Sequence, residues 1–497
     1  MIYFSKETLR DKIYACWVGK NIGGTMGTPY EGTQKLLDIQ GFATEAGTVL
    51  PNDDLDLQLV WLRAMDEVGP ENVNEQVLGE YWLSYIGPAW NEYGVGKSNM
   101  REGLLPPISG EVYNERWKHS NGAWIRTEIW ACLFPGLPER AIRYAFYDAC
   151  VDHGYNEGTY AAIFVAAMES AAFIFNDLNI LLKIGLSKIP SDCRVAKAVR
   201  LVMEEYSKGT DWKAVRNMLV EQSADIGWFQ APANVAYVVL GLLYGGCDFK
   251  KSMILALNCG DDTDCTGATL GALLGIMYGT AGIPADWSEH IGDQIVTICN
   301  LNGHGKWPAT NTDLTNYVLD MLPATVRDFR YFNAYHSNSI TAYPGRTVDH
   351  RIELSDREDF SDITPETFMG DQFVSEMFSH SHYSIHQSGI YCDVWVELDS
   401  IPEITPLGSI AGKVSVKNMR MHPNQHYHLR WLLPEGWTAS CKANLTSDKP
   451  YSDYTENGTA TFTITAGDQV APTNRIVLEV SCVGRPTCVY VPITLLG

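Results

Sequence analysis

The densest group of chemically active side chains lies at residues 260–267, which read GDDTDCTG. Asp261, Asp262 and Asp264 place three carboxylates beside hydroxyl groups and a thiol, directly before a long apolar segment. Asp and Thr cap helices well, but capping needs only one or two of them, and carboxylates crowded on one turn repel each other unless a cation lies among them. Hard cations such as Mg²⁺ and Mn²⁺ prefer oxygen ligands. The segment therefore favours a divalent-cation site, with simple capping as the alternative.

Residues 51–56, PNDDLD, form a second acidic segment at a predicted helix start. Taken alone, capping and the helix dipole explain Asn52 and the acids after it slightly better than metal binding does. A second acidic segment changes the balance, because binuclear sites commonly take their carboxylates from separate elements. The pair of acidic helix starts indicates a site for one or two divalent cations, Mg²⁺ or Mn²⁺.

The glycine-rich segment 23–31, GGTMGTPYE, is the third candidate. Its glycines permit close backbone packing or a positive φ angle. Glu31 ends the segment, and a carboxyl group at the end of such a turn can serve as a general acid or base. The alternative is an ordinary solvated loop glutamate. The catalytic interpretation of Glu31 therefore depends on the other two segments.

These segments need a scaffold, and the first two thirds of the chain predict helices. Apolar residues recur at helical spacing in residues 57–64, and residues 161–173, 235–244 and 269–278 are apolar enough for buried helices. Beyond residue 345, short alternating runs separated by turn residues are typical of a β-sandwich. The runs are residues 390–398, 410–416, 426–433, 459–465, 475–483 and 488–495. We predict a multidomain protein, with an all-α domain over residues 1–335 followed by an all-β sandwich domain over residues 346–497.

Composition narrows the classes of partner. A length of 497 residues suggests roughly two or three domains. The formal net charge of -22 repels phosphate backbones, so we expect no nucleic-acid partner. No apolar run reaches the ~18 residues of a membrane span, and the first residues carry charges where a secretory leader would be apolar. We therefore expect a cytoplasmic protein that does not bind membranes, and the oligomeric state stays open.

Five segments follow one another in an order that occurs in one enzyme family. The segments are residues 23–31, 52–54, 121–126, 152–156 and 260–265. Together they make residues 10–300 resemble the ADP-ribosylglycohydrolase family, which includes the dinitrogenase reductase-activating glycohydrolase. The resemblance implies an orthogonal all-α fold around two divalent cations. In that family the cations bind ribose hydroxyls and orient the scissile bond, and an acidic residue assists the departure of the leaving group.

The resemblance also assigns roles to single residues. It places Glu31 at the catalytic carboxylate position and gives Asp54 and Asp262 a part in catalysis. The metal-ligand positions fall on Asn52, Asp53, Asp54, Asp262, Asp264 and Cys265, with Thr266 as a substitute for Cys265. The residues expected near the substrate are Gly122, His153 and Tyr155. An ordinary core histidine is the alternative for His153, and Arg126 fits a tie between helices better than a phosphate ligand.

Four positions depart from the family pattern. Asn52 and Cys265 each replace a Thr, Gly24 replaces an Asp, and Asp261 replaces a Gly. A thiol is a softer ligand than a hydroxyl group, so the departure at Cys265 bears directly on metal preference. These changes leave open whether both metal positions, and strict specificity for ADP-ribose, are kept.

We interpret the chain as a metal-dependent glycohydrolase that cleaves an ADP-ribosyl or related furanosyl bond. Its partner would be a small-molecule or protein-linked ADP-ribosyl or furanosyl substrate. One alternative is a glycoside or nucleoside hydrolase that acts on a non-phosphorylated furanoside. The other is a relative that binds the ligand without turnover.

Two groups in the C-terminal region have weaker claims to function. His380, His382 and His386 are close enough in sequence for a metal site, but a polar loop explains them better. Three tryptophans offer a sugar-binding platform as one interpretation, and packing in the sandwich core is the favoured one: Trp395, Trp431 and Trp437.

Overall fold

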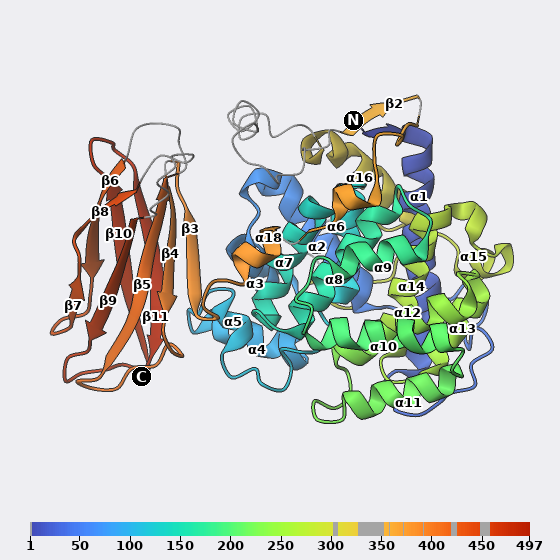
Figure 1. Ribbon diagram of the computed structural model, residues 1–497, viewed down its shortest axis with the longest axis horizontal. Coiled ribbons are helices and arrows are strands. Elements are labelled where there is room, and N and C mark those ends of the chain that lie inside the picture. The colour runs from blue at the N-terminus through green and yellow to red at the C-terminus, as the bar shows by residue number, and fades with distance from the viewer. Residues whose placement is uncertain are drawn as a thin grey trace. The chain divides into compact units, whose positions relative to one another are not determined.

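The computed structural model describes residues 2–301, 307–326, 352–356, 358–370, 372–390, 392–418, 425–447 and 458–497. Within these residues the chain forms two compact units, one helical and one made of strands (Figure 1). Unit 1 takes residues 2–94, 114–326 and the described part of 352–375. Unit 2 takes Val95–Tyr113 and the described part of Glu376–Gly497. The divisions after Gly94 and after Ser375 fall within helices α4 (Asn91–Arg101) and α18 (Gln372–Met377), and a third follows Tyr113.

Unit 1 is a bundle of helices in which α1 (Lys6–Gly27), α2 (Asp53–Val68) and α14 (Thr263–Tyr278) lead to the three chemically active segments. Helices α8 (Glu157–Ala172), α12 (Ala231–Gly245) and α14 bury nearly every side chain, as interior helices do. The other helices are α3 (Glu75–Tyr85), α6 (Glu128–Leu133), α7 (Pro138–His153), α9 (Leu178–Leu186), α10 (Arg194–Lys208), α11 (Trp212–Gln222), α13 (Phe249–Asn258), α15 (Ala285–Ile291) and α16 (Asn311–Thr325). None of the described helices is both long and apolar enough to cross a membrane.

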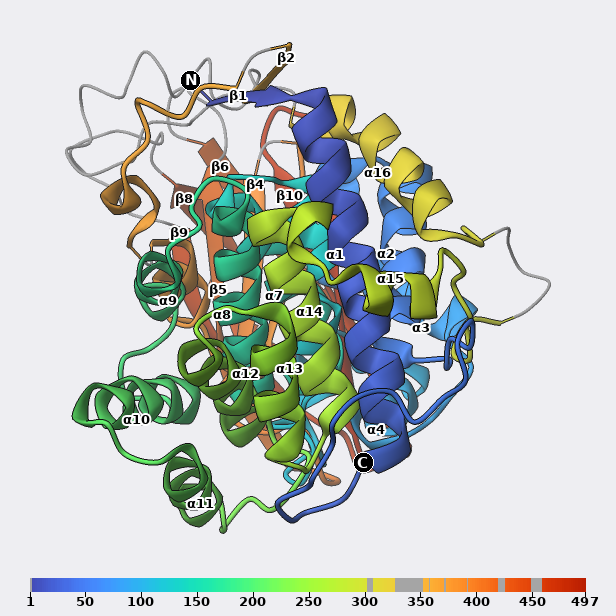
Figure 2. The ribbon, with the colours of Figure 1, turned by 90° about the vertical axis from the view of Figure 1, so that its right-hand side faces the viewer.

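Helices α1 and α14 lie side by side along their length (Figure 2). Glycines four residues apart line the contact on both helices. A Cβ atom at Gly23 would lie 1.9 Å from the carbonyl oxygen of Gly267, and one at Gly19 would lie 2.1 Å from that of Gly271. Only glycine permits backbones to approach this closely. Because the pairing is antiparallel, Gly27 at the end of α1 meets the start of α14, where Thr263 Oγ1 donates a 2.8 Å hydrogen bond to the Gly27 carbonyl.

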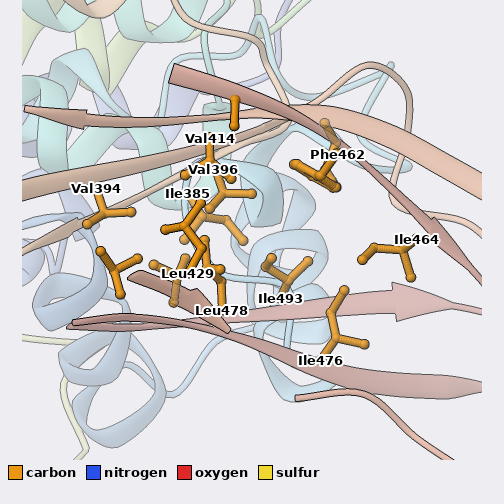
Figure 3. Packing of buried hydrophobic residues seen from close by; sticks show 14 of the residues in the cluster. Ile385, Val394, Val396, Val414, Leu429, Phe462, Ile464, Ile476, Leu478 and Ile493 are labelled. Atoms are coloured by element: carbon orange, nitrogen blue, oxygen red, sulfur yellow. The ribbon is translucent and has the colours of Figure 1, made fainter. Parts of the chain in front are cut away.

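Unit 2 is a sandwich of two antiparallel sheets. One sheet has the order β11-β10-β6-β8 and the other β3-β4-β5-β9-β7. Apolar side chains from both sheets, such as Val396 and Leu478, point toward one another in the core (Figure 3). The strands are β3 (Ser384–Ser388), β4 (Cys392–Leu398), β5 (Ser409–Asn418), β6 (Gln425–Leu432), β7 (Thr438–Cys441), β8 (Asn444–Ser447), β9 (Gly458–Thr465), β10 (Thr473–Cys482) and β11 (Cys488–Leu496). Inward and outward positions alternate along β5 and β9, which is the pattern that predicted a sandwich.

The predicted fold class, a helical region followed by antiparallel strands, is confirmed. The division predicted between residues 335 and 346 lies outside the described residues and stays a prediction. Two segments nevertheless belong to units that their sequence position does not suggest. Strand β2 (Ile352–Ser355) pairs in parallel with β1 (Ile2–Ser5) in unit 1. Helix α5 (Ile108–Glu111) contributes Ile108 to the sandwich core of unit 2.

The aromatic and histidine groups of unit 2 are structural. His380 and His386 both stack on the Trp395 ring, with ring centroids 3.7 and 4.3 Å away. His380 and His386 also pair with Glu397 and Asp393, respectively. In the described residues, no group of three metal-binding side chains close enough to share an ion includes a histidine of unit 2.

The other two tryptophans pack within the sandwich. Trp437 is buried, and its Nε1 donates to the Gln469 carbonyl over 3.3 Å. The Trp431 ring packs 4.8 Å from that of Phe462. Core packing therefore explains these rings, as the sequence favoured.

The close contact of α1 and α14 makes a prediction about Gly23. Replacing it by Ala raises helix propensity by about 1 kcal/mol, but the new methyl group would collide with the backbone of α14. We expect Gly23→Ala to lower the free energy of unfolding by about 1–3 kcal/mol net, the usual cost of overpacking. The matched control is Gly41→Ala, since no atom lies within 4 Å of a Cβ there. Thermal melts that coincide for the two variants would contradict the prediction.

Candidate functional site

The site begins where α2 and α14 begin. Asn52 caps α2, and its side-chain oxygen accepts a 2.7 Å hydrogen bond from the Asp54 N–H. Asp262 is the N-cap residue of α14, and its backbone carbonyl accepts a 3.1 Å hydrogen bond from the Thr266 N–H. Asn121 Nδ2 donates to Asp262 Oδ2 over 2.6 Å. Capping therefore fixes the backbone of both acidic segments, yet it uses few of their carboxylate oxygens.

The carboxylates gather into two overlapping clusters. One cluster comprises Asp54, Asp264 and Cys265, and the other comprises Glu31, Asp262 and Asp264. Within each cluster the potential ligand atoms all lie within 4.8 Å of one another, and both clusters share Asp264. A carboxylate shared between neighbouring clusters is an arrangement suited to two cations. The structure thus brings together five of the residues that the sequence singled out.

The buried oxygens of these clusters lack hydrogen-bond partners among the described residues. They are both carboxylate oxygens of Asp54, and Oδ1 of Asp262 and of Asp264. Burial raises the pKa of Asp262 to about 8. Burial, and next the neighbouring Asp262 charge, raise the pKa of Asp264 well above its ordinary value. Buried oxygens that no donor satisfies, in groups that repel each other, are the chemistry that a divalent cation would satisfy.

A buried lysine lies beside the first cluster. Lys20 Nζ is 3.8 Å from Asp54 Oδ1, but it donates 2.7 Å hydrogen bonds to Glu128 Oε1 and to the Ile125 carbonyl. Gln58 links the same groups, since its Nε2 donates to Glu128 Oε2 and to the Asp54 carbonyl. Lys20 therefore neutralises Glu128 first, and leaves the Asp54 carboxylate only partly compensated.

Three of the predicted metal ligands are not members of the two clusters: Asn52, Asp53 and Thr266. The Tyr93 hydroxyl donates to Asp53 Oδ2 over 2.8 Å, and Asp53 belongs to neither cluster. Thr266 Oγ1 donates to the Thr263 carbonyl within its own helix over 3.1 Å. Asn52 Nδ2 donates to Asp264 Oδ2 over 3.4 Å, so Asn52 contacts a cluster member. Their role as metal ligands stays a prediction.

Gly24 and Asn52, the two positions at which the resemblance implies an Asp and a Thr, lie next to each other. A Cβ atom at Gly24 would lie 2.6 Å from Asn52 Nδ2. The Asn52 amide therefore fills space that a larger residue at position 24 would need.

The residues expected near the substrate are all packed tightly. A Cβ atom at Gly122 would lie 2.2 Å from Glu92 Oε1. His153 is fully buried, with Nδ1 2.7 Å from Asp152 Oδ1 and Nε2 3.1 Å from Ser120 Oγ. Tyr155 is buried with its ring 5.5 Å from that of Phe146. Their contact with substrate stays a prediction, and the surroundings of His153 are those of a core histidine.

Arg126 is a tie between helices. It is fully buried, and its Nε lies 3.0 Å from both Asp148 oxygens. Its terminal nitrogens donate to both Asp152 oxygens and to the Gly122 carbonyl. Every nitrogen of the guanidinium group thus has an acceptor inside the protein, which leaves none for a substrate phosphate.

The sequence did not reveal how Asp261 is used. Its backbone N–H donates to the Thr33 carbonyl, and its carbonyl accepts from the Gly32 N–H, both over 2.9 Å. Its side chain accepts from the Phe229 N–H and from Asn234 Nδ2, each over 3.1 Å. Asp261 therefore holds the turn after Glu31 in place. Lys20 and Asn234 were also missed, because nothing in their local sequence marks them.

One family model matches more than half of the chain. The family model described as ADP-ribosylglycohydrolase matches residues 5–310. ADP-ribosylarginine hydrolase Tri1 of Pseudomonas putida (strain GB-1) is 36% identical over 52 residues, which make up 10% of this chain and 14% of that protein. A solved structure described as an ADP-ribosylglycohydrolase-related protein complex has 19% identity and a TM-score of 0.45, over 64% of this chain and 99% of that one. A FixG-related protein from Vibrio parahaemolyticus has 11% identity and a TM-score of 0.18, over 22% of this chain and 97% of that one.

The thiol in the first cluster predicts an altered metal preference. A hydroxyl group is a harder ligand than a thiol, so Cys265→Thr should raise the affinity for Mg²⁺ relative to the parent protein. Titration calorimetry with Mg²⁺ and Mn²⁺ measures the change. Cys488→Thr is the control, because Cys488 is exposed on strand β11 and lies outside both clusters. Equal Mg²⁺ affinity of Cys265→Thr and the parent would show that this side chain does not reach the metal.

The raised pKa values predict how pH acts on the metal-free protein. Burial raises the pKa of Asp262 from about 4 in the unfolded chain to about 8 when folded, so the folded state binds more protons within that window. The free energy of unfolding of the metal-free protein should therefore fall as pH rises from 5 to 8. Added Mn²⁺ should raise the melting temperature more at pH 8 than at pH 5, since it competes with protons.

Melts at both pH values, in EDTA and in Mn²⁺, test this expectation. The same Mn²⁺-induced rise at both values would contradict it.

Proposed function

Because the chain belongs to the ADP-ribosylglycohydrolase family, we propose that it hydrolyses the glycosidic bond of an ADP-ribosyl or related furanosyl group, with one or two divalent cations. The observation that supports this most is the pair of buried carboxylate clusters that share Asp264. The family match alone supports hydrolysis of an ADP-ribose linkage. The clusters add a reason for a metal at this place in the fold.

The residues present fit Mg²⁺ or Mn²⁺. Asp54, Asp264 and Cys265 would hold one cation, and Glu31, Asp262 and Asp264 a second. When bound, the cations would supply positive charge that orients the vicinal hydroxyls of a furanose ring. The partnerless oxygens of Asp54, Asp262 and Asp264 support this fit, because protein donors leave them unsatisfied. Asp54 and Asp262 would thus serve catalysis through the charge that they position.

Glu31 is the proposed proton-transfer group. It is the exposed member of the second cluster, so a substrate can reach it. Partial burial, and next the Asp53 charge, raise the pKa of the Glu31 carboxyl above its ordinary value. A raised pKa favours a carboxyl group that gives a proton to the leaving group as the bond to the anomeric carbon breaks. The hydrogen bonds of Asp261 to Gly32 and Thr33 hold this carboxyl group next to Asp262.

One observation favours the alternative of a non-phosphorylated furanoside. The guanidinium of Arg126 is fully engaged with Asp148, Asp152 and Gly122. Lys20 is buried and engaged with Glu128. Neither cation can meet a diphosphate, so a neutral furanoside or nucleoside stays a candidate substrate.

The remaining expectations belong to the same proposal. The cytoplasm and a small-molecule or protein-linked substrate fit an enzyme of this family. The net charge of -22 argues against a nucleic-acid partner.

Turnover of ADP-ribosylarginine is the direct test of enzyme against a non-catalytic binder. Release of ADP-ribose should require Mn²⁺ or Mg²⁺ and stop in EDTA. A nucleoside and a methyl ribofuranoside, tested in parallel, distinguish the phosphorylated from the neutral substrate class. A metal-loaded protein that turns over none of the three would overturn the proposal.

Glu31→Gln should lower turnover of the preferred substrate by about 10²–10⁴-fold, the usual contribution of a general acid or base. The amide keeps the size of the side chain and removes only its proton chemistry. Asp225→Asn is the control, because Asp225 forms an exposed ion pair with Arg194 in the same unit. Turnover of Glu31→Gln at the parent rate would remove Glu31 from the mechanism.

A further inference from the structure

Two aromatic rings lie against the turn that carries Glu31. A Cβ atom at Gly32 would be 3.3 Å from Trp228 Cζ3 and 3.8 Å from Phe229 Cζ. The two rings stack on each other, with centroids 4.2 Å apart and planes at 29°. Trp228 is 39% exposed. Solvent therefore reaches an aromatic surface directly beside the proposed proton donor.

The backbone that presents these rings adopts a rare conformation. Phe229 has a φ of +60°, and Asp261 has a φ of +71°. For a bulky residue such as Phe229, a positive φ is a clear outlier. The two residues are joined, since the Phe229 N–H donates to Asp261 Oδ1 over 3.1 Å. Strain of this kind persists only where the surroundings hold it, and it is concentrated at ligand-binding sites.

Asp261 couples the aromatic pair to the acidic site. Its side chain holds Phe229, and its backbone holds Gly32 and Thr33 in the turn after Glu31. Its second carboxylate oxygen accepts from Asn234 Nδ2, and Asn234 Oδ1 in turn accepts from the Asp262 N–H over 3.2 Å. One residue thus fixes the distance between the rings, Glu31 and the start of α14.

The surroundings do not favour an anionic group. Lys20 and Arg126, two buried cations of this unit, donate to protein acceptors. An aromatic face binds flat rings through dispersion and needs no charge on them. The aromatic surface of Trp228 and Phe229 is therefore suited to the apolar face of a neutral ring.

We propose that Trp228 and Phe229 form a stacking wall for an uncharged ring of the substrate, next to the bond that Glu31 serves, and that Asp261 is the positioning residue for this wall. The ring is the one joined to the furanose, either a nucleobase or a second sugar. The identity of the cleaved bond rests on the proposed function, whereas binding at the wall can be measured without turnover.

Calorimetry on the full chain with Mn²⁺ tests the wall with three probes. Adenosine carries a base next to its furanose, sucrose carries a second sugar ring, and ribose carries neither. We expect the parent protein to bind adenosine or sucrose more tightly than ribose. Trp228→Ala should weaken the tighter of the two by about 10- to 100-fold, the usual effect of losing one stacking ring. Ribose and Mn²⁺ affinities should stay within about twofold.

The control for the loss of an exposed aromatic side chain is Tyr206→Ala on α10, because Tyr206 is 44% exposed and its ring packs on that of Tyr244. It should bind all three probes as the parent does. A parent protein that binds neither adenosine nor sucrose more tightly than ribose would overturn the wall. An affinity of Trp228→Ala equal to that of the parent protein would also overturn it.

Asp261→Gly tests positioning, because glycine tolerates the positive φ and removes only the side chain. It should weaken the same probe as Trp228→Ala does. Asp261→Asn should restore part of the affinity, since its Oδ1 can still accept from the Phe229 N–H, while its amide group faces the donor Asn234 Nδ2. Parent affinity for this probe in Asp261→Gly would overturn the positioning role.

Turnover separates this proposal from the proposed function. In an active enzyme, Trp228→Ala should raise KM about tenfold or more and change kcat little. An active enzyme with unchanged KM overturns the wall and keeps the proposed function. A protein that binds adenosine through Trp228 but cleaves no substrate keeps the wall and overturns the proposed function.

Discussion

The glycine-lined contact between α1 and α14 is the constraint on which the rest of unit 1 depends. The two backbones touch at Gly23 and Gly267, where no side chain fits between them. Antiparallel packing then forces the end of α1 to meet the start of α14. The turn with Glu31 and the acids at Asp262 and Asp264 come together for this reason. The packing of the two helix backbones thus determines where the acidic side chains of the site lie.

That geometry creates an electrostatic problem inside the helical unit. Asp54 and Asp264 are buried and close, while the nearest ammonium group, on Lys20, donates its hydrogen bonds elsewhere. In stability terms the cluster is a cost, because desolvated carboxylates without donors disfavour the folded state. Such unsatisfied charges are typical of a site where a bound ligand offsets their desolvation. By the same reasoning Arg126 is not a ligand-binding residue, because Asp148 and Asp152 compensate its charge inside the protein.

Much of this could be predicted from the sequence, and the rest could not for physical reasons. The clustering of Asp262 and Asp264 with Glu31 was predictable, because acids crowded at helix starts and a matching order of motifs carry local signals. The strands were predictable because inward and outward residues alternate. The rings of Trp228 and Phe229 gave no signal, since their position depends on a hydrogen bond to a residue far along the chain. The pairing of β1 with β2 is likewise a long-range contact that no local pattern encodes.

The contact between Gly24 and Asn52 couples two positions of the site. The Asn52 amide occupies the volume that a side chain at position 24 would fill. The same amide donates to Asp264, the residue that both acidic clusters share. A side chain introduced at position 24 would displace this amide and so disturb the shared carboxylate. The effects of substitutions at positions 24 and 52 are therefore not additive.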